Sequence, residues 1–307
     1  MSGAVSGVDW IAVDWGSSNL RAWGMAADGS VVVEDGSGAG AITLAPEGFE
    51  PALLAVIEPW LGDGRTDVVV CGMAGARGAW VEAAYAAVPC PPVPFAFARP
   101  EVADRRLAVR ILPGLKQEKP ADVMRGEETQ IAGLLAAEPG FDGIACLPGT
   151  HTKWVHVKGG EVVSFGSFMT GEIFALLAHQ SVLRRTVGAE GWSEEDFLEA
   201  ASDGLSRPER VVGRLFGLRA EGLLHGLAPE RARARLSGML IGAELAGARA
   251  YWLGREVVLI GAPALAAADR DALALAGLEA RVADATLMTR GGLIAAHEAL
   301  MAGRGVR

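Results

Sequence analysis

The chain contains one short pattern twice, in the same order and at a constant separation of 133 residues. Its five identical positions are Gly7, Asp9, Ile11, Ala12 and Gly16 in the first copy and Gly140, Asp142, Ile144, Ala145 and Gly149 in the second. Each copy predicts an apolar strand, a loop of small and hydroxyl-bearing residues, and a second strand that ends in a tight turn, at Asp28-Gly29 or Gly159-Gly160. Such a loop offers backbone N–H and hydroxyl groups without bulk, so it can bind phosphate. The repeat therefore predicts two similar domains that hold one polyphosphate.

Strands and helices alternate along the rest of the chain. We expect a helix over 46–61, a strand over 67–71 with a glycine-rich loop over 72–78, a short strand over 107–112, and a helix over 122–137 that links the halves. The second half becomes mostly helical, with helices over 171–183, 193–201, 208–223 and 229–253. It ends with a buried strand over 256–260, a helix after Pro263, a strand over 279–282 and a helix over 292–301. Strands followed by helices in a repeated order predict an α/β fold.

We place the boundary between the two domains near the middle of the chain. The first domain, 1–136, carries the first phosphate loop and the substrate side. The second domain, 137–307, carries the second phosphate loop and the adenosine side. A chain of 307 residues exceeds the usual size of a single core, which agrees with two domains.

Composition limits the classes of partner. The net charge of −9 argues against nucleic acid or an acidic membrane surface, because both require a basic face. The three cysteines have no Cys-x-x-Cys or Cys/His spacing, so neither a disulfide framework nor a zinc site is supported. No signal segment opens the chain, and no apolar run approaches roughly 18 residues. We expect a cytoplasmic protein with a small-molecule partner, and homodimerisation stays open.

The first loop carries the sharpest local signal, Asp14-x-Gly16-Ser17-Ser18-x-x-Arg21. A carboxylate at the end of a buried strand can hold Mg²⁺, and the Gly-Ser-Ser bend offers donors to phosphate oxygens. Arg21 adds a planar cation for a transferring phosphoryl group. The alternative is an ordinary hairpin in which Asp14 caps its own turn. The second copy of the pattern favours the phosphate site, because turn chemistry alone does not predict a repeat.

The second loop, Gly149-Thr150-His151-Thr152-Lys153, has a different set of polar groups. Two threonine hydroxyls and the Lys153 ammonium suit the β- and γ-phosphates. A polar bend with a solvated lysine is the alternative. A single loop histidine is more often a structural hydrogen-bonding residue than a proton carrier, which makes His151 the weaker candidate.

The helix that links the halves begins with an acidic pair, Glu127 and Glu128, beside Arg125 and Thr129. Phosphoryl transfer to an alcohol needs a carboxylate within hydrogen-bond reach of the hydroxyl, so either glutamate is a candidate catalytic base. Acidic residues in a first helical turn are also favoured by the helix dipole alone. We prefer Glu127 as the base and keep Glu128 and Asp14 as further catalytic candidates.

Other residues are candidates for binding the two substrates. Arg77, Lys116 and Arg125 are candidate anchors for an anionic substrate, although solvated surface cations are the commoner explanation. Gly261 and Ala262 join a buried strand to a helix and could let a nucleoside lie close to the backbone, although a plain strand-to-helix turn would look the same. The P-loop, the dinucleotide fingerprint and the Gly-x-Ser-x-Gly elbow are all absent from the sequence.

Several strings in the chain resemble known proteins. They are 14–21, 72–75, 122–130, 147–154 and 167–172. They resemble the superfamily of sugar kinases, hsp70 and actin, in which two ribonuclease-H-like domains bind ATP in the cleft between them, and within it the 2-dehydro-3-deoxygalactonokinase family. The resemblance implies an ATP- and Mg²⁺-dependent kinase that phosphorylates the 6-hydroxyl of 2-dehydro-3-deoxy-D-galactonate, a step in galactonate degradation.

The same resemblance assigns residues to roles. Asp14, Gly16, Ser17, Ser18 and Arg21 correspond to the first phosphate motif, Gly149, Thr150, Thr152 and Lys153 to the second, and Gly261 and Ala262 to the adenosine motif. Many sugar kinases of this superfamily have an aspartate base where this chain has Glu127 and Glu128, so the identity of the base stays open. Three alternatives stay open for the function: a kinase for a related 2-keto-3-deoxy sugar acid, a nucleotide-binding regulator, and a phosphohydrolase.

Overall fold

Each repeated hairpin lies inside a five-stranded sheet in the computed structural model, which describes residues 5–94 and 96–304. The first sheet has the order β3-β2-β1-β4-β6 and contains β1 (Trp10–Trp15), β2 (Leu20–Met25), β3 (Val31–Ser37), β4 (Thr66–Gly72) and β6 (Leu107–Ile111). The second has the order β11-β10-β9-β12-β13 and contains β9 (Gly143–Leu147), β10 (Thr152–Lys158), β11 (Glu161–Phe168), β12 (Val257–Gly261) and β13 (Arg281–Asp284). In both, the hairpin is antiparallel and the strands beyond β1 or β9 run parallel. The predicted α/β class and the repeat are thus confirmed.

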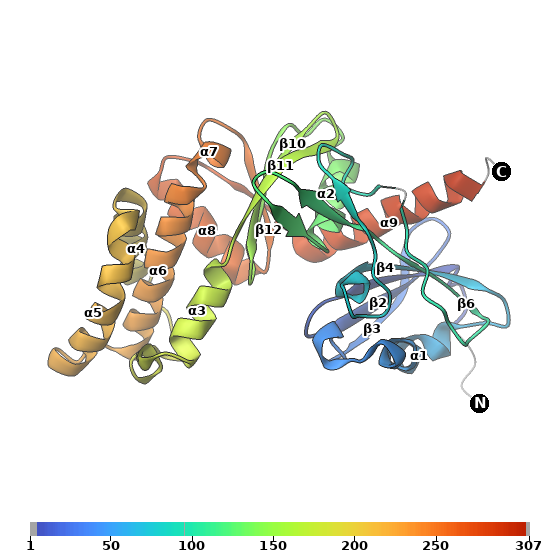
Figure 1. Cartoon of the computed structure of the whole chain (residues 1–307), viewed down its shortest axis with the longest axis horizontal. Helices are drawn as coiled ribbons and strands as arrows, with labels where there is room; N and C mark the ends of the chain where they lie inside the picture. Colours follow the sequence, from blue (N-terminus) through green and yellow to red (C-terminus); the bar gives the residue numbers. More distant parts are fainter. Residues whose placement is uncertain (1–4, 95, 305–307) are drawn as a thin grey trace. The chain divides into compact units, whose positions relative to one another are not determined.

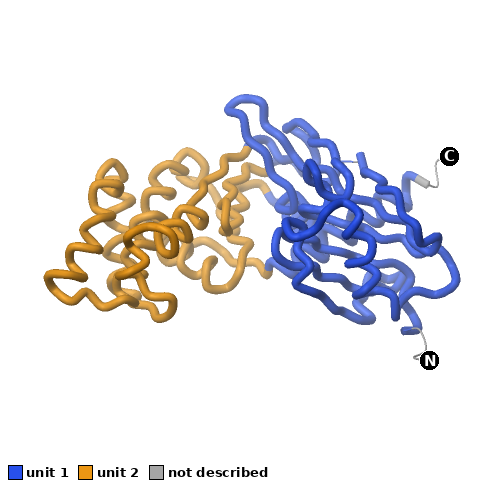
Figure 2. The backbone as a smooth tube through the Cα atoms, turned by 60° about the horizontal axis from the view of Figure 1, so that its bottom comes forward, with its two compact units in different colours: residues 1–141, 158–164, 285–307 blue, residues 142–157, 165–284 orange. Residues whose placement is uncertain are grey.

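The chain divides into two compact units, coloured separately in Figure 2. Unit 1 comprises 1–141, 158–164 and 285–307, and unit 2 comprises 142–157 and 165–284. This division differs from the expected boundary near residue 136, because the last helix belongs with unit 1.

The first sheet is covered on both faces, in the way that the alternation along β1 requires. Ile11, Val13 and Trp15 pack on the side of α1 (Phe49–Ile57). Trp10 and Ala12 point to the other face, where they meet α9 (Ala285–Arg304). Figure 1 shows α1 and α9 on opposite sides of this sheet. The central strand is therefore buried on both sides, and the half-buried Asp14 lies near its carboxyl end.

Helix α9 joins unit 1 because it packs closely on α2 (Glu127–Ala137). The contact depends on two glycines: a Cβ at Gly133 would collide with the carbonyl oxygen of Met288, and one at Gly292 with that of Thr129. A contact between residues this far apart cannot be predicted from local sequence. For this reason the last helix was placed in the second domain, 137–307, with the residues that precede it.

Unit 2 adds a group of helices to its sheet. They are α3 (Thr170–His179), α4 (Glu194–Ser206), α5 (Val211–Leu224), α6 (Pro229–Gly247), α7 (Arg249–Trp252) and α8 (Pro263–Leu275). Figure 1 shows α4, α5 and α6 side by side, and α4 and α5 both pack on α6. Ser193 caps the start of α4: its Oγ accepts a hydrogen bond from the backbone N–H of Asp196 at 3.4 Å.

Some predicted boundaries differ from the structure. A small sheet in the order β5-β7-β8 was not predicted; its strands are β5 (Tyr85–Ala87), β7 (Gly114–Gln117) and β8 (Asp122–Met124). The helix expected over 122–137 begins only at Glu127, because its first residues form β8. The last helix begins earlier than expected, directly after β13. Short 3-10 turns occupy Ala41–Thr43, Pro46–Gly48, Glu58–Trp60, Met73–Gly75, Val182–Arg185 and Pro208–Arg210.

The tight turns of the two hairpins are as expected, with positive φ at Gly29, Gly159 and Gly160. Within residues 5–94 and 96–304, no helix combines the length and the apolar character needed to cross a membrane.

Candidate active site

The first phosphate loop presents Asp14 at the carboxyl end of β1. Oδ2 of Asp14 accepts a hydrogen bond from Nη2 of Arg21 at 2.5 Å, directly across the hairpin, and Oδ1 faces the Cys71 thiol at 3.8 Å. Ser17 and Ser18 are exposed at the tip of the loop. Two backbone hydrogen bonds fix the loop, because the N–H groups of residues 41 and 42 donate to the carbonyls of residues 16 and 17. The predicted acid, hydroxyls and cation are therefore together.

Two glycines bring this loop next to the start of α2. Gly72 ends β4 with φ of 85°, and a Cβ there would lie 2.5 Å from the carbonyl oxygen of Trp15 and 3.6 Å from Oδ1 of Asp14. Gly126 precedes α2 with φ of 107°, and its Cβ would lie 3.5 Å from Cα of Gly72. L side chains rarely adopt this backbone conformation, and there is no room for one at Gly72. The acidic pair that follows Gly126 is thereby placed beside the Asp14 loop.

The two glutamates at the start of α2 differ in their surroundings. Oε2 of Glu127 accepts the backbone N–H of Arg125 at 3.0 Å, and Oε2 of Glu128 accepts that of Gly126 at 2.7 Å. Glu128 is 1% exposed, and burial followed by the charge of Glu127 raises its pKa to about 8. Glu127 is half-buried. The accessible member of the pair is thus Glu127.

Burial likewise raises the pKa of the Cys71 thiol well above its ordinary value, and the charges of Asp14 and Glu128 raise it further. Cys71 is therefore a neutral donor that separates two acids. Since both carboxylates act on this one thiol, Asp14 and Glu128 lie in the same region of unit 1.

Two of the three predicted anion anchors lie on one face of the small sheet. Lys116 of β7 pairs with Val123 of β8, so the side chains of these two residues share a face, and Gly114 lies on the same face. Arg125 follows on that face, because its guanidinium stacks on Tyr85 at 4.3 Å and Tyr85 is paired with Gly114. A Cβ at Gly114 would lie 2.7 Å from the Tyr85 ring, so only glycine leaves space for this stacking.

Arg125 is the more firmly held of these anchors. Its Nη2 donates to the carbonyl of Ala83 at 2.7 Å, whereas Nε and Nη1 are buried without a hydrogen-bond partner in the described part of the chain. Lys116 pairs with Glu118 at 2.7 Å. Arg77, the third predicted anchor, has an 88% exposed side chain, and its Nε lies 3.4 Å from Oε1 of Glu82.

The second phosphate loop is packed against the start of α3. A Cβ at Gly171 would collide with the carbonyl oxygen of Gly149, and the backbone N–H of Glu172 donates to the carbonyl of Thr150 at 3.0 Å. Nε2 of His151 lies 2.6 Å from Oε2 of Glu172. His151 therefore joins the loop to α3, which agrees with a structural role.

Lys153 and Thr152 point to opposite faces of β10. Lys153 is only 4% exposed, and its Nζ donates to the carbonyl of His151 at 3.2 Å. It is absent from the lining of the adjacent pocket, whereas Thr150 and Thr152 belong to it.

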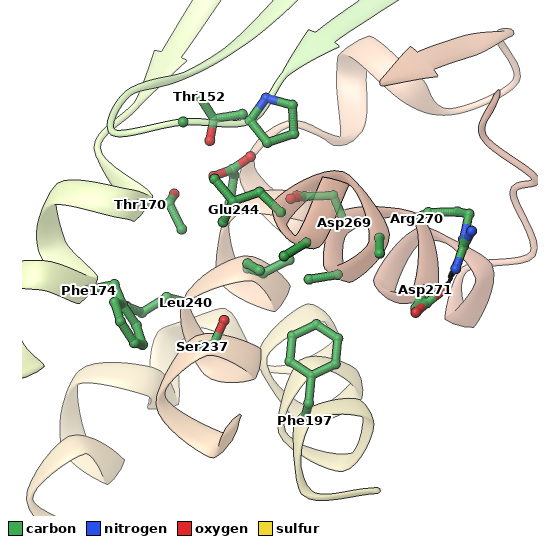
Figure 3. A pocket seen from close by; sticks show the side chains of 18 of the residues that line it. Thr152, Thr170, Phe174, Phe197, Ser237, Leu240, Glu244, Asp269, Arg270 and Asp271 are labelled. Carbon is green, nitrogen blue, oxygen red and sulfur yellow. Dashed lines mark hydrogen bonds and ion pairs between the residues drawn. The ribbon is translucent and has the colours of Figure 1, made fainter. Parts of the chain in front are cut away.

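That pocket, with a volume of about 840 Å³, lies wholly within unit 2 (Figure 3). It extends from the second phosphate loop to helices α3, α4, α6 and α8, and this volume falls in the range of small-molecule sites. Its walls include Gly149, Thr150, Thr152, Thr170, Phe174, Trp192, Phe197, Arg233, Ser237, Glu244, Ala264, Leu265 and Asp269.

Gly261 and Ala262 stand at the edge of this pocket. They directly precede α8, whose residues from Ala264 onward form one wall. A Cβ at Gly261 would lie 3.2 Å from the carbonyl oxygen of Pro148. The structure therefore brings the predicted adenosine turn against the predicted second phosphate loop.

Two acids in this pocket were not singled out from the sequence. Glu244 and Asp269 are 4% and 3% exposed, and burial raises the pKa of both carboxyls. Nε1 of Trp154 donates to Oε1 of Glu244 at 2.9 Å. Glu244 interrupts an apolar helical run, Ile241 to Leu245, and a carboxylate on the buried face of a helix is the signal that could have found it.

A family model described as 2-keto-3-deoxy-galactonokinase matches residues 14–296. A relative from Rhizobium meliloti (strain 1021), named "Probable 2-dehydro-3-deoxygalactonokinase DgoK1", is 39% identical over 95% of this chain and 97% of its own. The 2-dehydro-3-deoxygalactonokinase of Escherichia coli (strain K12) is 35% identical over 79% of this chain and 81% of its own.

Solved structures agree with these matches. A crystal structure of a Sinorhizobium meliloti protein given the same enzyme name has a TM-score of 0.86 at 40% identity, covering 94% of this chain and 96% of that one. The ADPNP-bound activator of 2-hydroxyisocaproyl-CoA dehydratase from Clostridium difficile has a TM-score of 0.53 at 14% identity, covering 97% and 98%. The second likeness is one of fold alone.

Proposed function

The chain belongs to the 2-keto-3-deoxy-galactonokinase family, and from this premise we propose that it transfers the γ-phosphoryl group of ATP to the 6-hydroxyl of 2-dehydro-3-deoxy-D-galactonate. Membership makes it a sugar kinase, a phosphotransferase with an alcohol as acceptor. The products are ADP and 2-dehydro-3-deoxy-6-phosphogalactonate. The observation that carries the proposal is the pocket of about 840 Å³ in unit 2, which opens from the predicted phosphate loop in a chain of this family.

We assign this pocket to ATP. Its volume suits a nucleotide, and its walls combine apolar side chains with the hydroxyls of Thr150 and Thr152 next to Gly149. The phosphates would lie at the loop, where small residues and backbone N–H groups allow close approach. The adenosine would lie toward α8, whose first turn follows Gly261 and Ala262. Phe174 of α3, on which the Arg233 guanidinium stacks at 5.0 Å, adds an aromatic side chain to another wall of the pocket.

The first loop in unit 1 suits Mg²⁺ and the transferring phosphoryl group. Its donors are the Asp14 carboxylate and the exposed hydroxyls of Ser17 and Ser18, all of them oxygens of the kind that Mg²⁺ prefers. When bound, Mg²⁺ neutralises charge on the phosphate oxygens. Arg21 holds the Asp14 carboxylate in place and supplies a second positive charge at the loop.

Glu127 is our choice for the base that accepts the proton of the acceptor hydroxyl. It is half-buried and therefore reachable, whereas Glu128 is buried with a raised pKa of about 8. A carboxyl that keeps its proton at neutral pH is a poor base. Glu128 instead fixes the turn before α2 through the backbone N–H of Gly126.

Arg125 and Lys116 are our choice for binding the carboxylate of the sugar acid. They share a face of the small sheet, and Arg125 has two buried nitrogens without a hydrogen-bond partner in the described chain. A guanidinium matches the two oxygens of a carboxylate. Arg125 is also two residues from Glu127, so the anchor for the substrate carboxylate and the catalytic base come from the same short segment. Arg77 stays the weaker candidate because its side chain is almost fully exposed.

A cytoplasmic location completes the proposal, since ATP is supplied there. Cys71, Cys90 and Cys146 are all free thiols, as a reducing compartment would leave them.

A coupled assay that detects ADP tests the proposal. We expect ATP consumption that depends on 2-dehydro-3-deoxy-D-galactonate, with the phosphate recovered on the sugar acid. Release of free phosphate at the same rate without the acid would instead identify a phosphohydrolase or a regulator. Equal rates with the gluconate-derived epimer would show that the kinase does not discriminate between the two epimeric acids.

The anchors are tested by KM for the sugar acid. Arg125→Lys keeps the charge but loses the planar fork, so we expect KM for the acid to rise about tenfold or more with KM for ATP unchanged. Arg77→Ala serves as the exposed control. If KM for the sugar acid rises in Arg77→Ala and not in Arg125→Lys, Arg77 is the residue that binds the carboxylate.

A further inference from the structure

Two acidic side chains in the nucleotide pocket have no part in the mechanism above. Glu244 of α6 and Asp269 of α8 both line the pocket, and both are more than nine-tenths buried. Figure 3 shows the Glu244 carboxyl below Thr152 and the Asp269 carboxyl directed toward Glu244, whose charge raises the pKa of Asp269. Two carboxylates buried together repel each other and lose hydration, so a proton or a cation has to neutralise them.

The groups around this pair donate hydrogen bonds but carry no positive charge. Nε1 of Trp154 donates to Oε1 of Glu244 at 2.9 Å, and the hydroxyls of Thr170 and Thr152 lower the pKa of the same carboxyl. Among the described residues, no arginine or lysine lowers the pKa of Glu244 or Asp269. A buried acidic pair without a basic partner needs a shared proton or a bound cation to neutralise it.

One oxygen of the pair lacks a partner altogether. Oε2 of Glu244 is buried and, within the described chain, accepts no hydrogen bond. An unsatisfied buried carboxylate oxygen costs free energy comparable to a lost charged hydrogen bond. Glu244 belongs to the wall of the pocket, so this unsatisfied carboxyl group belongs to a residue that a ligand in the pocket would contact.

The position of the pair in the pocket identifies the kind of ligand. Thr152 follows the phosphate loop directly, and Thr170 begins the helix that packs on that loop. The pair therefore lies at the end of the pocket that we assign to the phosphates. Carboxylates next to phosphates repel them, and a bound cation would reverse that repulsion.

We propose that Glu244 and Asp269, together with the hydroxyls of Thr152 and Thr170, bind a divalent cation of the Mg²⁺ class at the phosphate end of the pocket. All four donors are oxygens, and Mg²⁺ in phosphoryl-transfer enzymes is commonly held by one or two carboxylates, with water and phosphates completing its shell. This site belongs to unit 2 and is separate from Asp14 of unit 1. It rests on the proposed function only in that nucleotide phosphates are taken to lie beside it.

Binding of Mn²⁺ alone to the metal-stripped, nucleotide-free full chain tests the site, with free Mn²⁺ measured by electron paramagnetic resonance. We expect the wild type to bind Mn²⁺ and Glu244→Gln and Asp269→Asn each to bind it at least about tenfold more weakly. Glu244→Gln keeps an acceptor for Trp154, which favours folding. Asp271→Asn removes a more exposed acid from the same pocket and should leave Mn²⁺ binding unchanged. Asp14→Asn removes the ligand proposed for the unit 1 site, and the Mn²⁺ that depends on Glu244 and Asp269 should still bind to this variant.

Equal Mn²⁺ affinity in the wild type and in both unit 2 variants would overturn the proposal and identify a pair that shares a proton. Loss of Mn²⁺ binding in Asp14→Asn alone would overturn it as well. If one of the two unit 2 variants does not fold, the other is tested by its Tm. We expect added Mg²⁺ to raise the Tm of the wild type more than that of this variant, and equal shifts would overturn the proposal. Mn²⁺ binding through Glu244 in a protein that does not phosphorylate the sugar acid would refute the proposed function and leave this site standing.

Discussion

Arg21 lies directly across the first hairpin from Asp14, with Nη2 2.5 Å from Oδ2. The second hairpin has a basic residue at the matching position, because Lys153 lies across from Leu147. Its loop is one residue shorter, so the alignment of the two copies changes after the glycine. The first copy thus keeps an acid and a base together, whereas the second keeps only the base. Because of this asymmetry, only the first loop offers a carboxylate to a metal ion.

Asp14→Asn should separate catalysis from stability. The side chains of Arg21 and Asp14 are 48% and 19% exposed, and partly exposed ion pairs contribute on the order of 0–1 kcal/mol to folding. If Asp14 holds the metal, we expect kcat to fall at least about a hundredfold while the free energy of unfolding changes by less than about 1 kcal/mol. Steady-state kinetics and urea denaturation measure the two. A folded Asp14→Asn enzyme with normal turnover would remove Asp14 from the site.

The hairpins were predictable because their signal is local. Strand alternation, a small-residue loop and a glycine turn lie within about twenty residues, and the repeat supplied an internal control. The small sheet was not predictable in the same way: Tyr85–Ala87 and Gly114–Gln117 are too short to show a period, and they pair across a proline-rich segment. The assignment of α9 to unit 1 depends on glycine contacts between positions more than 150 residues apart.

The residues of the candidate site also fall into two groups, those that the sequence predicted and those that it did not. Loop residues such as Asp14, Gly149 and Thr152 were found from motif and repeat. The helical walls of the pocket were not, since residues such as Ser237 and Asp269 are single polar positions on different helices that only the fold brings together. Chemistry carried by a contiguous loop can be recognised in one sequence, whereas chemistry assembled from several helices requires the packing.

Glu128 should make stability depend on pH in the absence of nucleotide and Mg²⁺. Its pKa in the folded chain is about 8, against an ordinary value of 4.5, so the folded state keeps a proton that the unfolded state loses. Stability should therefore fall as pH rises from about 5 to 8 and level off above that. Glu128→Gln should flatten this slope and be more stable than the wild type at pH 8, by up to a few kcal/mol.

Denaturant titrations at pH 5, 6.5 and 8 measure this slope. Glu127→Gln is the informative neighbour, because it removes the charge that helps to raise the pKa of Glu128 and should make the slope shallower without abolishing it. A Glu128→Gln variant with the same slope as the wild type would contradict the assignment.

Asp196 should stabilise unit 2 with the opposite dependence on pH. Its carboxylate accepts hydrogen bonds from Arg231 and Arg235, at 2.6 Å each, and from the Ser193 hydroxyl, and these partners hold its pKa far below the ordinary value. The stabilisation should be complete above about pH 4, the pKa of an unfolded aspartate, and decline as pH falls below it. Asp196→Asn should cost about 3 kcal/mol at neutral pH, because it leaves two guanidinium groups without their acid.

The check is the difference in unfolding free energy between wild type and Asp196→Asn at pH 7 and at pH 3. That difference should narrow at the lower pH. Glu195→Gln changes an exposed acid one position earlier in the same helix and should cost far less at either pH. A difference that widens at pH 3 would be inconsistent with a depressed pKa.

Gly171→Ala should weaken ATP binding through the second phosphate loop. A Cβ at this position would collide with the carbonyl oxygen of Gly149, so either the loop or the first turn of α3 has to move. Because we assign that loop to the phosphates of ATP, we expect KM for ATP to rise about tenfold or more while KM for the sugar acid changes little. Gly213→Ala in α5 is the matched control: its Cβ would meet nothing within 4 Å, so helix propensity alone should stabilise the chain by about 0.5–1 kcal/mol. Equal KM for ATP in both variants would show that the fit of α3 against the loop does not matter for the nucleotide.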